Sequence, residues 1–344
     1  MENRTQKDVA ALLAEATPEA ASQLQELAES APDKETRKVA RRALYRLSLA
    51  GVRPPERAPA PKTAEPTPSD TLRAYASAYD GAGNRLVFCV VPDPDGGWPT
   101  LLQTLINDEE GTKDFSARRM SRREVAERVD RFEQQLENGL AFAEIEGDYG
   151  RWLLHEARLL NLRLGQLSPP GFLEWMERVG EPRGSYETPP VFAALNPEEV
   201  RADPSVPHDP AAFFALPWFE PWFLAARDVY EWLDAWEKSE ASVLAVPESA
   251  KAERRERIVT EAVNKLLTPE ARERYTHRLE ESADILRRRD KMEAARIALY
   301  HALALADNKP VADVPFARAL VRRTIEAAAQ MLERIRHGEA QATA

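Results

Sequence analysis

Residues 72–91 read LRAYASAYDGAGNRLVFCVV, and this stretch marks a change of period in the chain. Its two runs, 72–79 and 85–91, flank the glycine-containing turn DGAGN, and the second run is rich in β-branched and aromatic residues. Runs of this kind around a short turn predict a β-hairpin. A second pair of runs, at 100–106 and 112–117, flanks the turn NDEEG. Together the four runs predict a small antiparallel sheet.

The segment after these strands carries a helix signal. Ser121 and Glu124 have the spacing of a capping box, in which each side chain bonds to the backbone N–H of the other residue. The helix that they open is expected to run to about residue 138, and residues 141–146 are a candidate for one more strand. Residues 71–147 are therefore predicted to form a small α+β unit, an antiparallel sheet with one covering helix.

From residue 148 onward the pattern is helical almost throughout. Proline at the first helical position after a capping residue, as in Thr268-Pro269, is typical of helix starts. Helices are expected at 149–164, 170–179, 219–239, 248–267, 269–289, 291–306 and 315–337. The predicted fold class is mainly α (α+β): a helical N-terminal arm at 1–50, the small sheet unit, and a C-terminal α-helical array at 148–344.

Two regions resemble helical-repeat families. Residues 7–50 contain short alanine-rich helical segments and resemble one unit of a HEAT-like repeat. Residues 272–308 resemble a tetratricopeptide helical hairpin in the spacing of small and large residues, namely Leu279, Ala283, Leu286, Ala295, Ala302, Leu303 and Leu305. Both resemblances imply helices that need neighbours to bury their faces. They favour a protein that presents helical surfaces to a partner.

Residues 51–70 separate the arm from the sheet unit. This stretch has almost no large apolar side chain and contains six prolines: Pro54, Pro55, Pro59, Pro61, Pro66 and Pro68. Such a composition cannot bury enough surface to offset the entropy of ordering the chain. It predicts an extended, semi-rigid linker.

Composition limits the class of protein. The 344 residues carry a net charge of −10, which opposes non-specific attraction to nucleic acid or to an anionic membrane. Cys89 is the single cysteine, which excludes an intrachain disulfide and a cysteine-based zinc site. The sequence has neither a run of about 18 apolar residues nor the pattern of a signal peptide. A cytoplasmic protein without membrane segments is expected.

The segment 213–236 holds nine of the 26 aromatic residues (7 Trp, 8 Tyr and 11 Phe) and the motif Pro-Trp-Phe twice. Aromatic side chains dominate both cores and interface hot spots, so two interpretations stay open. Trp218, Phe219 and Trp222 are either core anchors or candidate partner-binding residues in a groove. The aromatics of the expected helix lie on several sides of it, which favours the core, particularly for Trp222.

A basic helix is the second candidate surface. Lys34, Lys38, Arg42 and Arg46 recur every four residues, with Arg41 beside them. Like charges at this spacing repel one another, so an anionic partner would stabilise the face. Phosphate backbones favour such a surface. The alternative is a solvated face without a ligand.

Catalytic and metal-binding patterns are not found in the sequence. His155 lies on an expected helix without the second histidine that a zinc-protease helix requires. We therefore expect no catalytic residue, no metal and no cofactor. The expected function is a non-enzymatic helical adaptor or scaffold that binds a protein partner. The alternatives are an RNA- or ribosome-associated factor using the basic helix, and an enzyme with a pocket between the β unit and the aromatic helix.

The linker generates a prediction for limited proteolysis. We expect the first cleavage between residues 51 and 69, leaving a stable fragment that begins near Leu72, because proline-rich backbone without tertiary contacts is accessible to proteases. Mass spectrometry of the first fragments measures this. Initial cleavage between residues 248 and 337 would contradict the expected boundary.

Overall fold

The computed structural model describes residues 12, 17, 20–24, 28, 34–49, 72–135, 139–240 and 247–342. The chain divides into two compact units, Met1–Glu65 and Pro66–Ala344. The division falls inside the stretch predicted to be a linker, and that stretch lies outside the described residues. The cleavage experiment on it stays a prediction.

The N-terminal unit has a small helical core. Helix α3 (Lys34–Leu49) buries Ala43 and Leu47 against Ala21 and Leu24. Thr17 accepts a hydrogen bond from the backbone N–H of Ala20 at 3.2 Å, as expected for a helix cap. Helical structure in this arm, expected from the alanine-rich pattern, is confirmed for the described residues.

The second unit begins with the sheet that the hairpin pattern predicted. Its strands are β1 (Arg73–Ser77), β2 (Asn84–Val91), β3 (Thr100–Asn107), β4 (Gly111–Arg119) and β5 (Phe142–Ile145). They pair antiparallel in the order β4-β3-β2-β1-β5. Both hairpins and the fifth strand are therefore confirmed, and β5 joins the free edge of β1.

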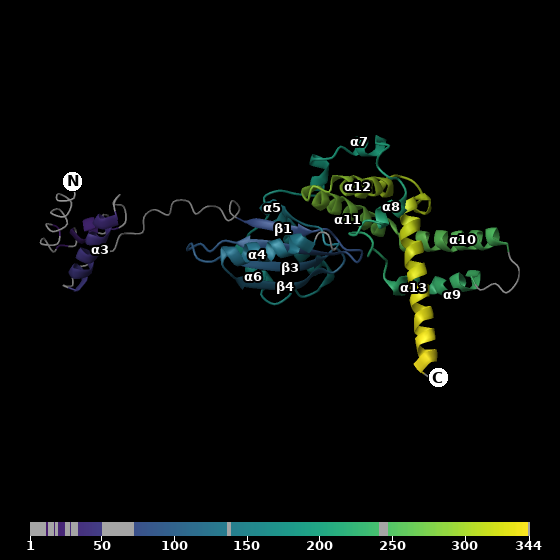
Figure 1. The fold of residues 1–344 in the computed structure, drawn as a ribbon, viewed down its shortest axis with the longest axis horizontal. Helices are drawn as coiled ribbons and strands as arrows, with labels where there is room; N and C mark the ends of the chain where they lie inside the picture. Colours follow the sequence, from purple (N-terminus) through teal and green to yellow (C-terminus); the bar gives the residue numbers. More distant parts are fainter. Residues whose placement is uncertain are drawn as a thin grey trace. The chain divides into compact units, whose positions relative to one another are not determined.

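Helix α4 (Arg122–Glu133) covers one face of the sheet, as expected (Figure 1). Its capping box is present: the Ser121 hydroxyl accepts from the N–H of Glu124 at 3.2 Å, and the Glu124 carboxylate accepts from the N–H of Ser121 at 2.8 Å. Val125 and Val129 pack on Phe88 and other side chains of this face. Successive side chains of a strand point to opposite faces of the sheet. The residues between those that face α4, such as Ala74, Val87 and Cys89, therefore make the opposite face apolar as well.

A second helix covers that opposite face. Helix α5 (Gly147–Leu164) packs on Ala74, Val87 and Cys89. The helix comes so close to β1 that a Cβ on Gly150 would collide with the Cβ of Ala74. The sequence predicted α5 as a helix but did not predict that it belongs to the sheet. Cys89 is buried, and burial raises the pKa of its thiol to about 12.

The remaining elements are helical. They are α6 (Phe172–Val179), η2 (Pro190–Ala193), α7 (Pro197–Ala202), α8 (Pro210–Phe214), α9 (Ala226–Glu240), α10 (Glu248–Leu266), α11 (Pro269–Arg288), α12 (Met292–Ala306), η3 (Val311–Asp313) and α13 (Pro315–Ala342). Helix α13 runs across α9 and α10 (Figure 1). The mainly α, α+β fold class is confirmed.

One expected helix begins later than predicted. Helix α9 was expected from residue 219 but begins at Ala226. Proline disfavours a helical conformation of the residue before it, so Pro221 opposes a helix that begins at residue 219. The chain forms successive turns there instead, with the Trp222 N–H bonded to Phe219 O at 3.0 Å.

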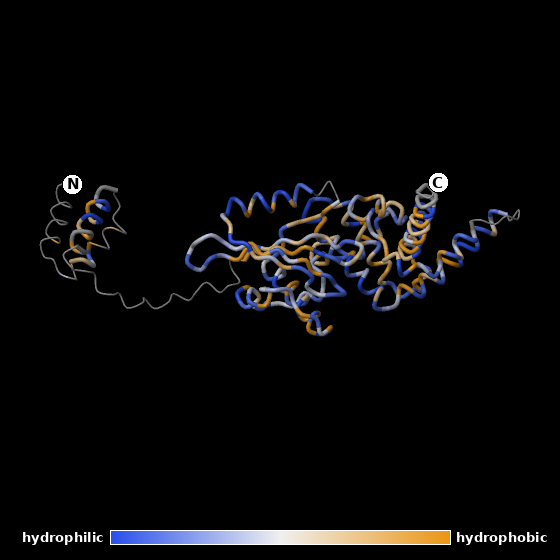
Figure 2. The backbone as a smooth tube through the Cα atoms, turned by 90° about the horizontal axis from the view of Figure 1, so that it is seen from below, coloured by the Kyte–Doolittle hydropathy of each residue, from blue (hydrophilic) through white to orange (hydrophobic). Residues whose placement is uncertain are grey.

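One hydrophobic core joins the α5 face of the sheet to the helical array. It runs from Ala74 in β1 through Tyr149 in α5 to Ala302 in α12 and Ile325 in α13. In Figure 2 the apolar colours accordingly lie along the strands and continue into the helical part. The core crosses residue 148, where the sequence placed a boundary, so the sheet and the array form one compact unit.

The aromatic segment lies inside this core. Phe219 and Trp222 are fully buried, and the ring of Phe213 stacks on Phe219 with centroids 4.1 Å apart. Trp218 is half-buried at the edge of the core. Burial of Phe219 and Trp222 agrees with the core interpretation and removes both from any exposed binding surface.

The buried indole supplies a stability prediction. Trp222→Ala is expected to lower the free energy of unfolding by about 3–5 kcal/mol, because it deletes a large side chain from a packed core. Trp98→Ala is the matched control, since Trp98 is 61% exposed, and it should change stability by no more than about 0.5 kcal/mol. Urea unfolding measures both. Equal effects of the two substitutions would contradict the burial of Trp222.

Candidate functional site

A buried ion pair holds the sheet against the helical array. Arg85 of β2 and Glu281 of α11 lie 2.6 Å apart, and both side chains are fully buried. The Tyr149 hydroxyl donates to the same Glu281 oxygen, and Arg85 Nε donates to the carbonyl of Ser77 at 2.8 Å. Three elements, β2, α5 and α11, therefore meet on one carboxylate.

The charges of this pair stabilise each other. Burial by itself lowers the pKa of Arg85, but the Glu281 carboxylate and the neighbouring Tyr149 and Tyr79 together more than offset this, so the pKa of Arg85 is raised. Burial, followed by the negative charge of Glu281, also raises the pKa of Tyr149 well above its ordinary value. Tyr149 thus remains a neutral donor to the carboxylate. At neutral pH, Arg85, Glu281 and Tyr149 therefore hold β2, α11 and α5 together.

Arg278, one turn before Glu281 on α11, fixes two turns of the sheet. Its guanidinium donates to both Asp108 oxygens, at 2.6 and 2.7 Å, and to the carbonyl of Gly81 at 3.0 Å. A Cβ on Gly83 would overlap Asp108 and Arg278, and Gly83 has a φ of +82°. Only glycine meets both requirements without strain. The glycines of DGAGN therefore serve this docking as well as the hairpin.

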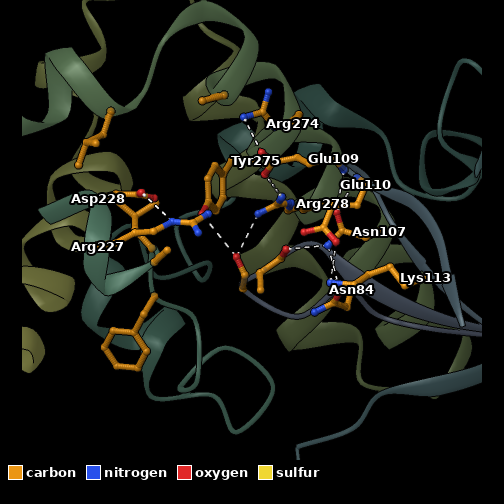
Figure 3. Close-up of a pocket in the computed structure, with 17 residues that line it drawn as sticks. Asn84, Asn107, Glu109, Glu110, Lys113, Arg227, Asp228, Arg274, Tyr275 and Arg278 are labelled. Atoms are coloured by element: carbon orange, nitrogen blue, oxygen red, sulfur yellow. Dashed lines mark hydrogen bonds and ion pairs between the residues drawn. The ribbon is translucent and has the colours of Figure 1, made fainter. Parts of the chain in front are cut away.

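A pocket opens beside Arg278, between the two turns and the helices (Figure 3). Its volume is about 350 Å³, within the range of small-ligand sites. The polar lining residues are Asn84, Asn107, Glu109, Glu110, Lys113, Arg227, Asp228, Arg274, Tyr275 and Arg278. The apolar wall includes Phe223, Leu224, Leu266 and Ala271. The side chains of Arg227, Tyr275 and Arg278 converge on its centre in Figure 3.

The pocket lies where one alternative expected it, between the sheet and the helix of the aromatic segment. Phe223 and Leu224 stand just before α9 and form its wall, whereas Trp222 points into the core. The lining can bind and orient a ligand through arginine donors and an apolar wall. Within the described part of the chain, no cluster of three or more His, Cys, Asp and Glu side chains could hold a metal ion.

The basic helix lies on the N-terminal unit. Lys38, Arg41 and Arg42 of α3 are exposed, on the side away from Ala40 and Ala43. Lys34 and Arg46 belong to the same helix, but their side chains lie outside the described residues. The solvent-facing side predicted for these cations is thus present for three of the five.

His155 does not join a catalytic cluster in the structure. Its Nδ1 lies 3.0 Å from Glu181 Oε2 on the surface. The carboxylates near it in sequence pair elsewhere: Glu144 with Arg73, and Glu146 with Arg288.

An exposed leucine surface was missed by the sequence reasoning. Leu159, Leu162, Leu164, Leu167 and Leu173, at the end of α5 and the start of α6, are between 36% and 96% exposed. The stretch LLNLRLGQL at 159–167 indicates this exposure in the sequence. Its leucines lie on several sides of the helix, and only one side packs on the sheet. We name these five residues the leucine surface.

Comparison with known proteins finds a similarity in one part of the chain. The family model described as Y4lR C-terminal helical domain matches residues 219–329, which include α9 to α12 and the first half of α13. No curated protein and no solved structure matches the chain. No helix in the described residues is both long and apolar enough to cross a membrane.

Two adjacent glutamates on α11 give opposite predictions. Glu281→Gln leaves the buried Arg85 charge without its carboxylate and should lower the free energy of unfolding by about 3–5 kcal/mol. Glu280→Gln should not lower the free energy of unfolding at neutral or higher pH. Burial, and then the charge of Glu281, raise the pKa of Glu280 from 4.5 to about 7. Ionised Glu280 therefore opposes folding, and wild-type stability should fall as pH rises through that range.

Urea unfolding at pH 5 and pH 8 separates the two variants. Glu280→Gln should match or exceed the wild type at pH 8 and should lose this part of the pH dependence. A loss from Glu281→Gln no larger than that from Glu280→Gln would show that the Arg85 pair does not hold the junction.

Proposed function

We propose that this chain is a non-enzymatic adaptor that binds a protein partner through the leucine surface. The observation that carries the proposal is the exposure of five large apolar side chains within fifteen consecutive residues, 159–173. Single exposed apolar residues are normal, but five within so short a segment favour an interaction site. Covering them would contribute roughly 25 cal/mol for each Å² of apolar area removed from water.

Four of the five leucines lie on helices α5 and α6, which supports recognition by shape, and Leu167 lies in the loop between them. Asn161, between the leucines of α5, donates to the carbonyl of Glu110 at 3.0 Å and accepts from the N–H of Thr112 at 2.8 Å. Phe172 at the start of α6 packs edge-on against Phe115 of β4 with centroids 5.4 Å apart. Both sides of the surface are therefore fixed to the sheet, and little ordering entropy opposes binding.

The test is a capture experiment from native lysate with the partner identified by mass spectrometry. The double variant Leu162→Glu/Leu167→Glu should lose the partner while keeping its melting temperature, because both side chains are exposed. Met331→Glu is the matched control, an apolar-to-charged change at a residue 61% exposed on α13. Retention of the partner by the leucine double variant would refute the proposal.

RNA binding by the basic helix is the second candidate function, supported by the exposure of Lys38, Arg41 and Arg42. RNA affinity should then fall steeply with salt, since each neutralised phosphate releases counterions. The variant Lys38→Glu/Arg42→Glu should abolish binding without a loss of stability. Absence of wild-type RNA binding at low salt would remove this candidate, and nuclease treatment of the captured complex distinguishes it from the adaptor.

A further inference from the structure

The pocket of Figure 3 has an excess of hydrogen-bond donors. Arg227 and Arg274 line it from the helical side, and neither donates a hydrogen bond to another described residue. Their ion pairs are long: 3.6 Å from Arg227 to Asp228 and 3.4 Å from Arg274 to Glu109. Arg274 Nε is also shielded from solvent without a hydrogen-bond partner. The donors of Arg227 can bond to water, because its side chain is 84% exposed, but the unpaired buried donor of Arg274 is costly, which points to an acceptor supplied from outside the chain.

The acceptors that the sheet turns contribute to the pocket are already engaged, and the Asp228 carboxylate at the start of α9 forms a 3.6 Å ion pair with Arg227. Glu109 Oε1 accepts from Arg278 at 2.9 Å, and Glu110 pairs with Lys113 at 2.9 Å. The side-chain oxygen of Asn107 accepts from the backbone N–H groups of Glu109 and Glu110 at 2.8 and 3.0 Å. Its amide donates to Ala82 O and to Asn84 Oδ1, both at 3.0 Å. The unused hydrogen-bonding capacity is therefore cationic and donating.

The opposite wall is apolar. Phe223, Leu224, Leu266 and Ala271 line it. The Tyr275 ring also lines the pocket, and the Arg278 guanidinium lies 4.7 Å from the centroid of that ring. A ligand that fills this space needs an apolar body on one side and acceptor oxygens on the other. Guanidinium groups match carboxylate and phosphate oxygens in geometry and charge.

We propose that this pocket binds a small organic anion, an apolar or aromatic body carrying a carboxylate or a phosphate, with Arg227 and Arg274 holding the anionic group. The volume of about 350 Å³ suits one such molecule. The site is carried by residues other than the leucine surface, so it stands or falls independently of the adaptor function.

The test uses the full-length protein and four probes in isothermal titration: phenylacetate, phenyl phosphate, inorganic phosphate and the neutral analogue phenylacetamide. Phenylacetate or phenyl phosphate should bind the wild type, and phenylacetamide should bind at least about tenfold more weakly than phenylacetate, because a charge-assisted hydrogen bond is lost. The better of the two anions shows whether the pocket prefers carboxylate or phosphate. Inorganic phosphate as tight as phenyl phosphate would overturn the role of the apolar wall.

Two variants and one control locate the binding. Arg227→Gln and Arg274→Gln should each weaken the anionic probes by about tenfold or more, with unchanged near-ultraviolet circular dichroism. Arg334→Gln, the same change at an exposed position of α13 outside the pocket, should leave binding unchanged. The proposal is overturned if neither organic anion binds at millimolar concentration, if the neutral analogue binds as well, or if all three variants bind like the wild type.

Discussion

The buried pair of Arg85 and Glu281 is the constraint on which the rest of the second unit depends. Taking both charges out of water costs several kcal/mol for each ion, and the cost is offset only when the two groups meet with good geometry. That geometry needs β2, α5 and α11 in place at once, because Tyr149 donates a further hydrogen bond to Glu281 and the Ser77 carbonyl accepts one from Arg85, whereas Arg85 Nη2 and Glu281 Oε1 are buried without a partner. The Arg85 pair, the contacts of Arg278 with the sheet turns and the shared hydrophobic core together specify how the sheet and the helical array pack.

The turn between β3 and β4 contacts the helical array and also supports both candidate binding sites. Asp108 receives Arg278, while Asn107 orders the backbone of the turn. The Glu109 and Glu110 side chains line the pocket, and the Glu110 carbonyl accepts from Asn161 of α5, the residue before Leu162. The pocket and the leucine surface thus share a support, although different residues would contact their ligands. Both are held by elements that the Arg85 pair anchors.

Local signals explain how much of the fold could be predicted. The hairpin around DGAGN, the capping box of Ser121 and Glu124, and proline after Thr268 are each written within a few residues, and each is confirmed. Helix α9 begins later than expected, because Pro221 disfavours a helical conformation of the residue before it. The docking of α5 on the sheet was not predicted, because a helix with apolar residues on several sides does not specify which neighbour covers which side.

The candidate sites depend on contacts between residues far apart in sequence. Arg85 and Glu281 are separated by 196 positions, and Arg278 and Asp108 by 170. In the sequence Arg278 and Glu281 look like ordinary charges of a solvated helix face, and nothing local marks them as buried. The aromatic segment is the reverse case. Its many aromatic residues mark it in the sequence as a core or a binding site, and Phe219 and Trp222 are buried in the core. Phe223, one residue later, lines the pocket.

The central claim is that the sheet and the helical array form a single cooperative unit through this junction. Native-state hydrogen exchange at increasing denaturant measures it directly, by comparing amides of β2 (Asn84–Val91) with amides of α12 (Met292–Ala306). The structure predicts that the slowest amides of both elements open with the same free energy and the same dependence on denaturant. Opening of α12 at a clearly lower free energy, while β2 stays protected, would contradict it.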